Sequence, residues 1–145
     1  MNDVERIKWN LRPLQKITLL YVEDDNDSRE QFSKYLKRYI VKELFVAKDG
    51  KEGLELFMEN NPDLILTDIL MPKMTGLEMI ERIRKDGYST PVVVLSAHDE
   101  MDKVMSALYL GVCRYVMKPV QTADLFQALL DCSKVCDTGK GGRHG

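Results

Sequence analysis

Five short runs rich in Val, Ile and Leu alternate along the chain with segments whose apolar residues recur at helical spacing. The runs occupy residues 17–22, 44–47, 64–67, 92–95 and 112–116. A strand that is apolar along its whole length is buried on both faces, which is typical of a parallel sheet covered by helices. Because crossovers between parallel strands are right-handed, the helices lie on both sides of the sheet. The pattern predicts a three-layer α/β domain, with a doubly wound five-stranded parallel sheet.

Helix starts are predicted where an acid or a threonine is followed three residues later by Glu, a spacing that allows a capping box. The pairs are Asp27 with Glu30, Asp49 with Glu52, and Thr75 with Glu78. In the second of these helices, Leu54, Phe57 and Met58 are expected to face inward. A fourth helix is expected at residues 101–108, and the last one presents an apolar stripe to the sheet. The stripe consists of Leu125, Ala128, Leu129 and Cys132.

Length and composition restrict the class of protein. A chain of 145 residues suggests one domain. The net charge is −2 and Lys and Arg form no basic stripe, so no nucleic-acid partner is expected. The apolar stretches are too short to span a bilayer. The three cysteines, Cys113, Cys132 and Cys136, follow no scaffold spacing and are expected to be free thiols in a reducing cytoplasm.

The two ends of the chain fall outside the strand and helix pattern. Residues 1–15 space Val4, Ile7, Leu11 and Leu14 as a helix would, but Pro13 interrupts the spacing. This N-terminal extension or linker is expected either to pack loosely or to dock on a partner or a second copy. The main domain is expected at residues 16–137, followed by a Gly-rich flexible tail at 138–145.

Reactive side chains follow four of the predicted strands. Glu23, Asp24 and Asp25 follow the first strand, Asp68 follows the third, Ser96 the fourth, and the fifth runs into Lys118. Carboxyl ends of parallel strands share one edge of the sheet, and ligands of open α/β sheets bind there. These carboxylates, one hydroxyl and one ammonium are therefore expected to converge.

Clustered carboxylates repel one another unless a cation lies among them. Oxygen ligands favour a hard cation, and Mg²⁺ commonly uses one or two carboxylates together with phosphate oxygens. A carboxylate such as Asp68 can act as a nucleophile and form an acyl phosphate. Lys118 can neutralise charge on the phosphoryl group, while the Ser96 hydroxyl donates a hydrogen bond to it. Taken singly, each residue fits a cap, a turn or the surface equally well, and only their joint placement at the strand ends points to phosphoryl chemistry.

Four motifs of this chain resemble those of response-regulator receiver domains in two-component signalling, and they occur in the same order as in that family. The motifs are residues 20–25, 63–76, 93–97 and 115–119, and the resemblance spans residues 16–137. It implies a flavodoxin-like fold with strand order 2-1-3-4-5. It also implies a phosphoacceptor that is no enzyme in the usual sense, with only self-catalysed phosphotransfer and slow autodephosphorylation.

The resemblance also implies a role for each matching residue. Asp68 is the phosphoacceptor, and Mg²⁺ (or Mn²⁺) is held by Glu23, Asp24, Asp68 and the backbone carbonyl of Leu70. Ser96 and Lys118 bind the phosphoryl group, Tyr115 is the switch aromatic, and Pro119 follows a cis bond. Glu23 stands where Asp is commoner, so its carboxylate is expected to shift outward and favour a water-mediated metal contact. Leu70 and His98 are rim residues that influence acyl-phosphate hydrolysis.

Implied partners are a sensor histidine kinase or phosphotransfer protein, and a downstream protein or output domain. A homodimer through the face of the fourth helix, fifth strand and fifth helix is a further expectation. The alternatives are a receiver fragment of a hybrid histidine kinase and a degenerate receiver that works without phosphorylation. An aspartyl phosphatase would carry a second acid where Leu70 stands, and a nucleotide-binding flavodoxin-like protein would carry a Gly-rich loop after the first strand.

Overall fold

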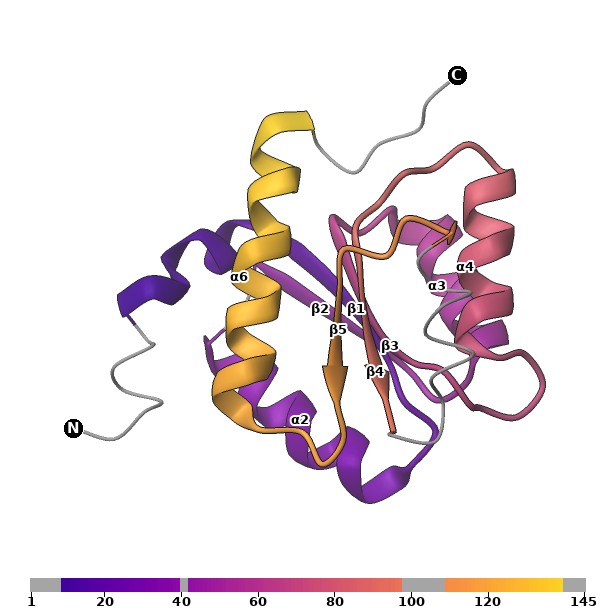
Figure 1. Cartoon of the computed structure of the whole chain (residues 1–145), viewed down its shortest axis with the longest axis horizontal. Helices are drawn as coiled ribbons and strands as arrows, with labels where there is room; N and C mark the ends of the chain where they lie inside the picture. The colour runs from indigo at the N-terminus through magenta and orange to yellow at the C-terminus, as the bar shows by residue number, and fades with distance from the viewer. Residues whose placement is uncertain (1–8, 40–41, 98–108, 140–145) are drawn as a thin grey trace.

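The computed structural model describes residues 9–39, 42–97 and 109–139, with side chains from 11 to 134 within those ranges. Its centre is a five-stranded parallel sheet of order β2-β1-β3-β4-β5 (Figure 1). The strands are β1 (Thr18–Val22), β2 (Glu43–Ala47), β3 (Leu64–Asp68), β4 (Val92–Ser96) and β5 (Arg114–Met117). Both the parallel sheet and the predicted order are confirmed.

Strand register brings the carboxyl ends of the strands together. Val22, the last residue of β1, pairs with Ala47 and Thr67 in the two neighbouring strands. Asp68 pairs with Leu95, so β3 and β4 end beside each other. The segments that follow β1, β3, β4 and β5 therefore emerge at one edge of the sheet.

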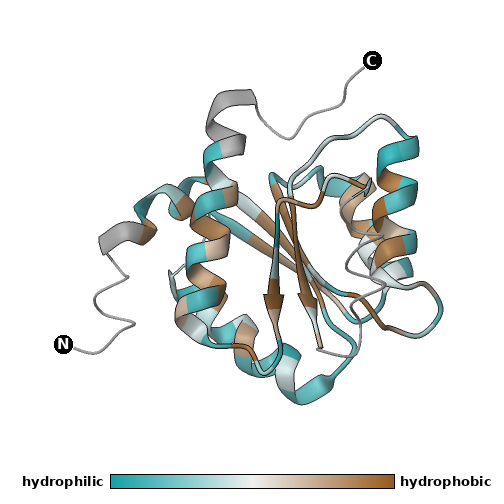
Figure 2. Ribbon diagram, in the orientation of Figure 1, coloured by the Kyte–Doolittle hydropathy of each residue, from teal (hydrophilic) through white to brown (hydrophobic). Residues whose placement is uncertain are grey.

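Helices cover both faces of the sheet, as Figure 1 shows. The helices are η1 (Trp9–Lys16), α2 (Asn26–Tyr39), α3 (Gly50–Asn60), α4 (Gly76–Lys85) and α6 (Thr122–Gly139). One apolar core lies between the sheet and η1, α2 and α6, and a second lies under α3 and α4. Figure 2 shows the strands largely in the brown of apolar residues, while the helices alternate between brown and teal. No helix in the described part of the chain could cross a membrane. The helix expected at residues 101–108 lies outside that part.

Helix stripes follow the predicted pattern with one exception. All four predicted α6 residues are buried, and so is Phe57 of α3. Met58 is 42% exposed, so its predicted inward orientation is wrong. The residue after Phe57 lies about 100° further around the helix, away from the sheet. Gly53 contributes to the inner face of α3 instead, where a Cβ would meet Val22 and the Met79 sulfur.

The predicted caps are correct at two of the three helices. Thr75 and Glu78 form the full capping box of α4. Asp49 caps α3 by accepting the Glu52 N–H, although the Glu52 carboxylate accepts from Lys48 and not from Asp49.

The prediction that Asp27 begins a helix is wrong, because α2 begins at Asn26. The Asp25 carboxylate accepts the Ser28 N–H at 2.8 Å and so caps the helix two residues earlier. Both Asp25 and Asp27 are residue types that cap helices, but only Asp27 has Glu three residues later, so the capping-box spacing pointed to the wrong acid.

The N-terminal segment packs more tightly than a loose extension. Leu11 and Leu14 are fully buried, and η1 packs against α6 and α2. Three residues make one turn of a 3₁₀ helix, so the two leucines lie on the same side of η1. Pro13 is accommodated inside this short helix. Docking of this arm on a partner stays a prediction, and residues 1–8 lie outside the described part. At the other end, α6 continues to Gly139, two residues into the expected tail.

The prediction of three free thiols is wrong for two of the cysteines. Cys113 and Cys132 form a disulfide, with their Cα atoms 6.1 Å apart. Cys113 lies just before β5, and Cys132 lies on the face of α6 that packs against the sheet. The pairing joins residues 19 positions apart, so no short spacing in the sequence indicates it. The side chain of Cys136 lies outside the described residues.

Candidate functional site

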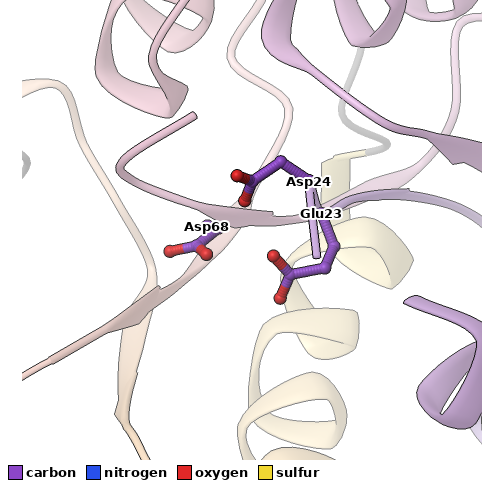
Figure 3. Close-up of side chains that lie close together, drawn as sticks. All are labelled: Glu23, Asp24 and Asp68. Atoms are coloured by element: carbon purple, nitrogen blue, oxygen red, sulfur yellow. The ribbon is translucent and has the colours of Figure 1, made fainter. Parts of the chain in front are cut away.

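An acidic cluster lies where β1 and β3 end. Glu23, Asp24 and Asp68 each offer a carboxylate oxygen, and these oxygens all lie within 4.8 Å of one another (Figure 3). Glu23 and Asp68 are buried, whereas Asp24 is exposed. The Glu23 side chain is enclosed in the site, and the water-mediated metal contact expected for it stays a prediction. Three carboxylates at this separation fit a hard cation, which would offset their mutual repulsion.

Asp68 is held by contacts to both of its carboxylate oxygens. Lys118 Nζ lies 2.6 Å from Oδ2, and the Ile69 N–H donates to Oδ1 at 2.8 Å. The Lys118 backbone N–H donates to the Ser96 carbonyl at 2.7 Å, which ties the lysine to the end of β4. The bond between Lys118 and Pro119 is cis. Asp68 and Lys118 are 50 positions apart in the sequence, and the sheet brings them into contact.

Burial and the neighbouring carboxylate change the protonation of Glu23. Desolvation is the larger cause, followed by the charge of Asp68, and together they raise the pKa of Glu23 to about 8. The Lys118 ammonium and the Asp25 N–H act in the opposite direction but do not cancel them. The acidic cluster thus retains a proton near neutral pH unless a cation takes its place.

Asp25 differs from its acidic neighbours. It is exposed, and the hydrogen bonds from Ser28 lower the pKa of its carboxyl group below the usual range. Its carboxylate is used as the cap of α2 and lies outside the metal-ligand cluster. Of the three successive acids after β1, the structure therefore assigns two to the site and one to the helix.

Of the predicted phosphoryl-binding residues, Lys118 is the one that contacts Asp68 within the described residues. Ser96 is fully buried, and its hydroxyl donates to the Met117 sulfur with 3.7 Å between the two atoms. Tyr115 is 47% exposed and Leu70 is 46% exposed. The role of the Leu70 carbonyl as a ligand stays a prediction, and His98 lies outside the described residues.

Two residues near Asp68 were missed by the sequence analysis. The Thr67 hydroxyl donates to the Asp68 carbonyl at 2.9 Å. Gly76 donates its N–H to the Ile69 carbonyl at 2.8 Å, and a Cβ at this position would collide with the Asp68 carbonyl. A glycine at the start of a helix is a signal in the sequence that another backbone group, here the Asp68 carbonyl, approaches closely. The Thr67 contact gives no such signal, because it depends on the turn after β3.

A third missed residue is Arg29, in the first turns of α2. Its guanidinium donates to the backbone carbonyls of Glu23 and Asp24. A basic residue soon after a run of acids is a weak signal on its own, because most such residues are solvated.

The family model described as the response regulator receiver domain matches residues 19–130. The chain belongs to this family.

Relatives of this receiver domain include the probable C4-dicarboxylate response regulator DctR of Priestia megaterium. It is 33% identical over 115 residues, which cover 77% of this chain and 50% of that protein. The Regulator of RpoS from Escherichia coli (strain K12) is 38% identical over 110 residues, covering 76% of this chain and 32% of that protein. The receiver domain therefore spans half or less of the length of these curated relatives.

Solved structures of similar fold support the same assignment. The N-terminal domain of an uncharacterized protein from Wolinella succinogenes has a TM-score of 0.77 and 40% identity, with 82% of this chain and 95% of that chain covered. The Francisella response regulator 1452 receiver domain has a TM-score of 0.73 and 28% identity, with 83% and 99% covered.

Proposed function

We propose that this receiver domain accepts a phosphoryl group on Asp68 from a histidine kinase or phosphotransfer protein. The observation that carries the proposal is the environment of Asp68. Its carboxylate lies 2.6 Å from the Lys118 ammonium and in a cluster with Glu23 and Asp24. A nucleophile, a fixed positive charge and a set of oxygen ligands thus meet at one edge of the sheet.

In the proposed reaction, a carboxylate oxygen of Asp68 forms a bond to phosphorus while the bond from phosphorus to the donor breaks. The donor group leaves with the electron pair of that bond, and the product is an acyl phosphate. The Lys118 ammonium offsets the added negative charge. Glu23, Asp24, Asp68 and the Leu70 carbonyl would hold the metal. Bound Mg²⁺, or Mn²⁺, would supply charge neutralisation on the phosphoryl oxygens.

The test of this proposal is the intact mass after incubation with acetyl phosphate. We expect a single phosphoryl adduct in the presence of Mg²⁺ and none when a chelator removes it, because the clustered acids repel the donor without a cation. Binding of Mg²⁺ without any adduct would favour the degenerate receiver. Catalytic release of phosphate from simple esters would favour a phosphatase.

The proposed switch couples the site to the neighbouring face. The Ser96 hydroxyl would leave the Met117 sulfur and donate to the phosphoryl group, and Tyr115 would turn inward from its half-exposed position. The face formed by β5 and α6 would then change its packing, which is a shift between two populated arrangements. Partners that bind this face are proposed to be a downstream protein, an output domain or a second copy of the chain.

Tyr115→Ala is expected to uncouple this face from phosphorylation. The changes in backbone amide chemical shift caused by phosphorylation would persist around Asp68. On α6 they would fall to less than about half of the wild-type changes, because the ring that couples the two packings of this face is absent. The matched control is Tyr109→Ala, which removes an almost fully exposed tyrosine. Undiminished shifts on α6 in the Tyr115 variant would contradict the proposed relay.

The proposal also places the protein in the cytoplasm, as a response regulator or as a receiver from a longer hybrid kinase. The Cys113–Cys132 disulfide removes the argument that three free thiols indicate a reducing compartment. The cytoplasmic location therefore depends on the proposed kinase partner alone.

A further inference from the structure

The side chain of Arg29 reaches back from α2 to the end of β1. Its Nη1 donates to the Glu23 carbonyl at 2.9 Å and to the Asp24 carbonyl at 3.3 Å. Its Nη2 donates to the Asn26 side-chain oxygen. The guanidinium therefore binds the backbone of the two acids that line the site, and these contacts are made to carbonyl oxygens.

The backbone of the same turn is closed by further hydrogen bonds. The Arg29 N–H donates to the Asp25 carbonyl at 2.9 Å, as part of the first turn of α2. The Asp25 N–H donates to the Glu23 carboxylate at 3.3 Å. Arg29 thus binds the turn with both its backbone and its side chain. Past the end of a strand, carbonyl groups lose their ladder partners. One guanidinium nitrogen of Arg29 binds two of these carbonyls, while the other nitrogen binds Asn26.

We propose that Arg29 is a positioning residue for the cation site. By binding the Glu23 and Asp24 carbonyls, it holds the turn after β1 in the conformation that directs both carboxylates toward Asp68. This inference rests on the proposed function, since it assigns Arg29 a role in binding the cation that phosphotransfer requires.

A competing role for Arg29 is that of a simple counter-charge for the acidic cluster, and the two roles predict opposite results. A counter-charge competes with a bound cation, so its removal would strengthen Mg²⁺ binding. A positioning residue prepares the ligands, so its removal would weaken Mg²⁺ binding. Loss of groups that orient metal ligands commonly costs about 10–100-fold in affinity.

The experiment is calorimetric titration of the metal-free protein with Mg²⁺, for the wild type, Arg29→Met and Arg29→Lys. We expect Arg29→Met to weaken binding about tenfold. Arg29→Lys keeps the charge but has a single nitrogen, which cannot bind both carbonyls and Asn26 in the same geometry, so it should recover only part of the loss. The matched control is Arg38→Met, which removes an exposed arginine of the same helix and should leave affinity within about twofold of the wild type.

The outcomes separate this inference from the proposed function. If the wild type binds Mg²⁺ and Arg29→Met binds it equally tightly or more tightly, the positioning role alone is overturned. Full recovery by Arg29→Lys would assign the effect to charge and overturn it as well. A wild type that binds no Mg²⁺ would overturn both the proposed function and the inference. If Arg29→Met fails to fold, the Arg29→Lys affinity and hydrogen exchange at residues 23–25 decide the question, since faster exchange in that turn is expected.

Discussion

Replacing Asp68 by asparagine is expected to abolish the phosphoryl adduct formed with acetyl phosphate and Mg²⁺. Asparagine keeps the size of the side chain, and its Oδ1 can still accept the Ile69 N–H that the wild type binds at 2.8 Å. A neutral amide is a poor nucleophile toward phosphorus, so the acyl phosphate cannot form. The expected loss is at least about 100-fold, down to the detection limit of intact-mass measurement.

The matched control for Asp68→Asn is Asp124→Asn, because Asp124 is an exposed acid in the first turn of α6. This variant should form the adduct at the wild-type rate. An adduct that persists in Asp68→Asn would mean that the nucleophile is misassigned, with Glu23 and Asp24 as the next residues to replace. Circular dichroism of both variants would verify that the loss does not arise from unfolding.

Magnesium affinity is expected to rise with pH below about 8 and to level off above it. Burial and the charge of Asp68 raise the pKa of Glu23 to about 8, so the metal-free site holds a proton near neutral pH. A cation bound by the Glu23 carboxylate must release that proton. Release of one proton gives a slope of up to about tenfold in affinity per pH unit. Titrations at about pH 6, 7, 8 and 9 would measure it.

Glu23→Gln is the matched variant for the pH experiment, because the amide has a similar size and does not titrate in this range. It should bind Mg²⁺ more weakly at high pH and show a nearly flat profile between about pH 6 and 8. An equally steep profile in Glu23→Gln would assign the proton to another group. A flat profile in the wild type would show that Glu23 is ionised in the metal-free protein.

The same raised pKa predicts how the stability of the metal-free protein depends on pH. In the unfolded chain Glu23 loses its proton near 4.5, whereas the folded protein keeps it until about 8. Between these values the folded state binds more protons, so the contribution of Glu23 to the free energy of unfolding falls as pH rises. Glu23→Gln should remove this contribution, and urea unfolding at about pH 5 and 8 would measure the difference between the two proteins.

Local patterns in the sequence predicted features that depend on neighbouring residues. The capping box of Thr75 and Glu78 is such a case, because both of its hydrogen bonds lie within four residues of chain. The apolar stripe of α6 is another, since helical spacing alone decides which residues share a face. Four of the strands follow from continuous apolar runs in the same way, whereas β5 contains Arg114 and is exposed at its first two residues.

The failures of local prediction have specific causes. The capping-box spacing points to Asp27, which is followed by Glu30, whereas Asp25 is followed at that spacing by Ser28; the structure nevertheless uses Asp25 as the cap, directly after β1. Met58 follows a correctly predicted inner residue, and a step of one residue is about 100° around a helix, so Met58 faces away from the sheet. The burial of Leu11 and Leu14 depends on a 3₁₀ helix, whose period differs from the α-helical spacing assumed for that segment.

By itself, the sequence determined the parallel α/β class and the set of acids, hydroxyl and lysine at the strand ends. It could do so because the apolar pattern of each strand and its alternation with helical segments can be read from neighbouring residues. Only the tertiary structure decided the contact of Lys118 with Asp68, the disulfide of Cys113 with Cys132, and the burial that raises the pKa of Glu23. These features depend on distances and solvent exclusion between segments far apart in the chain, and such quantities exist only after the helices have packed against the sheet.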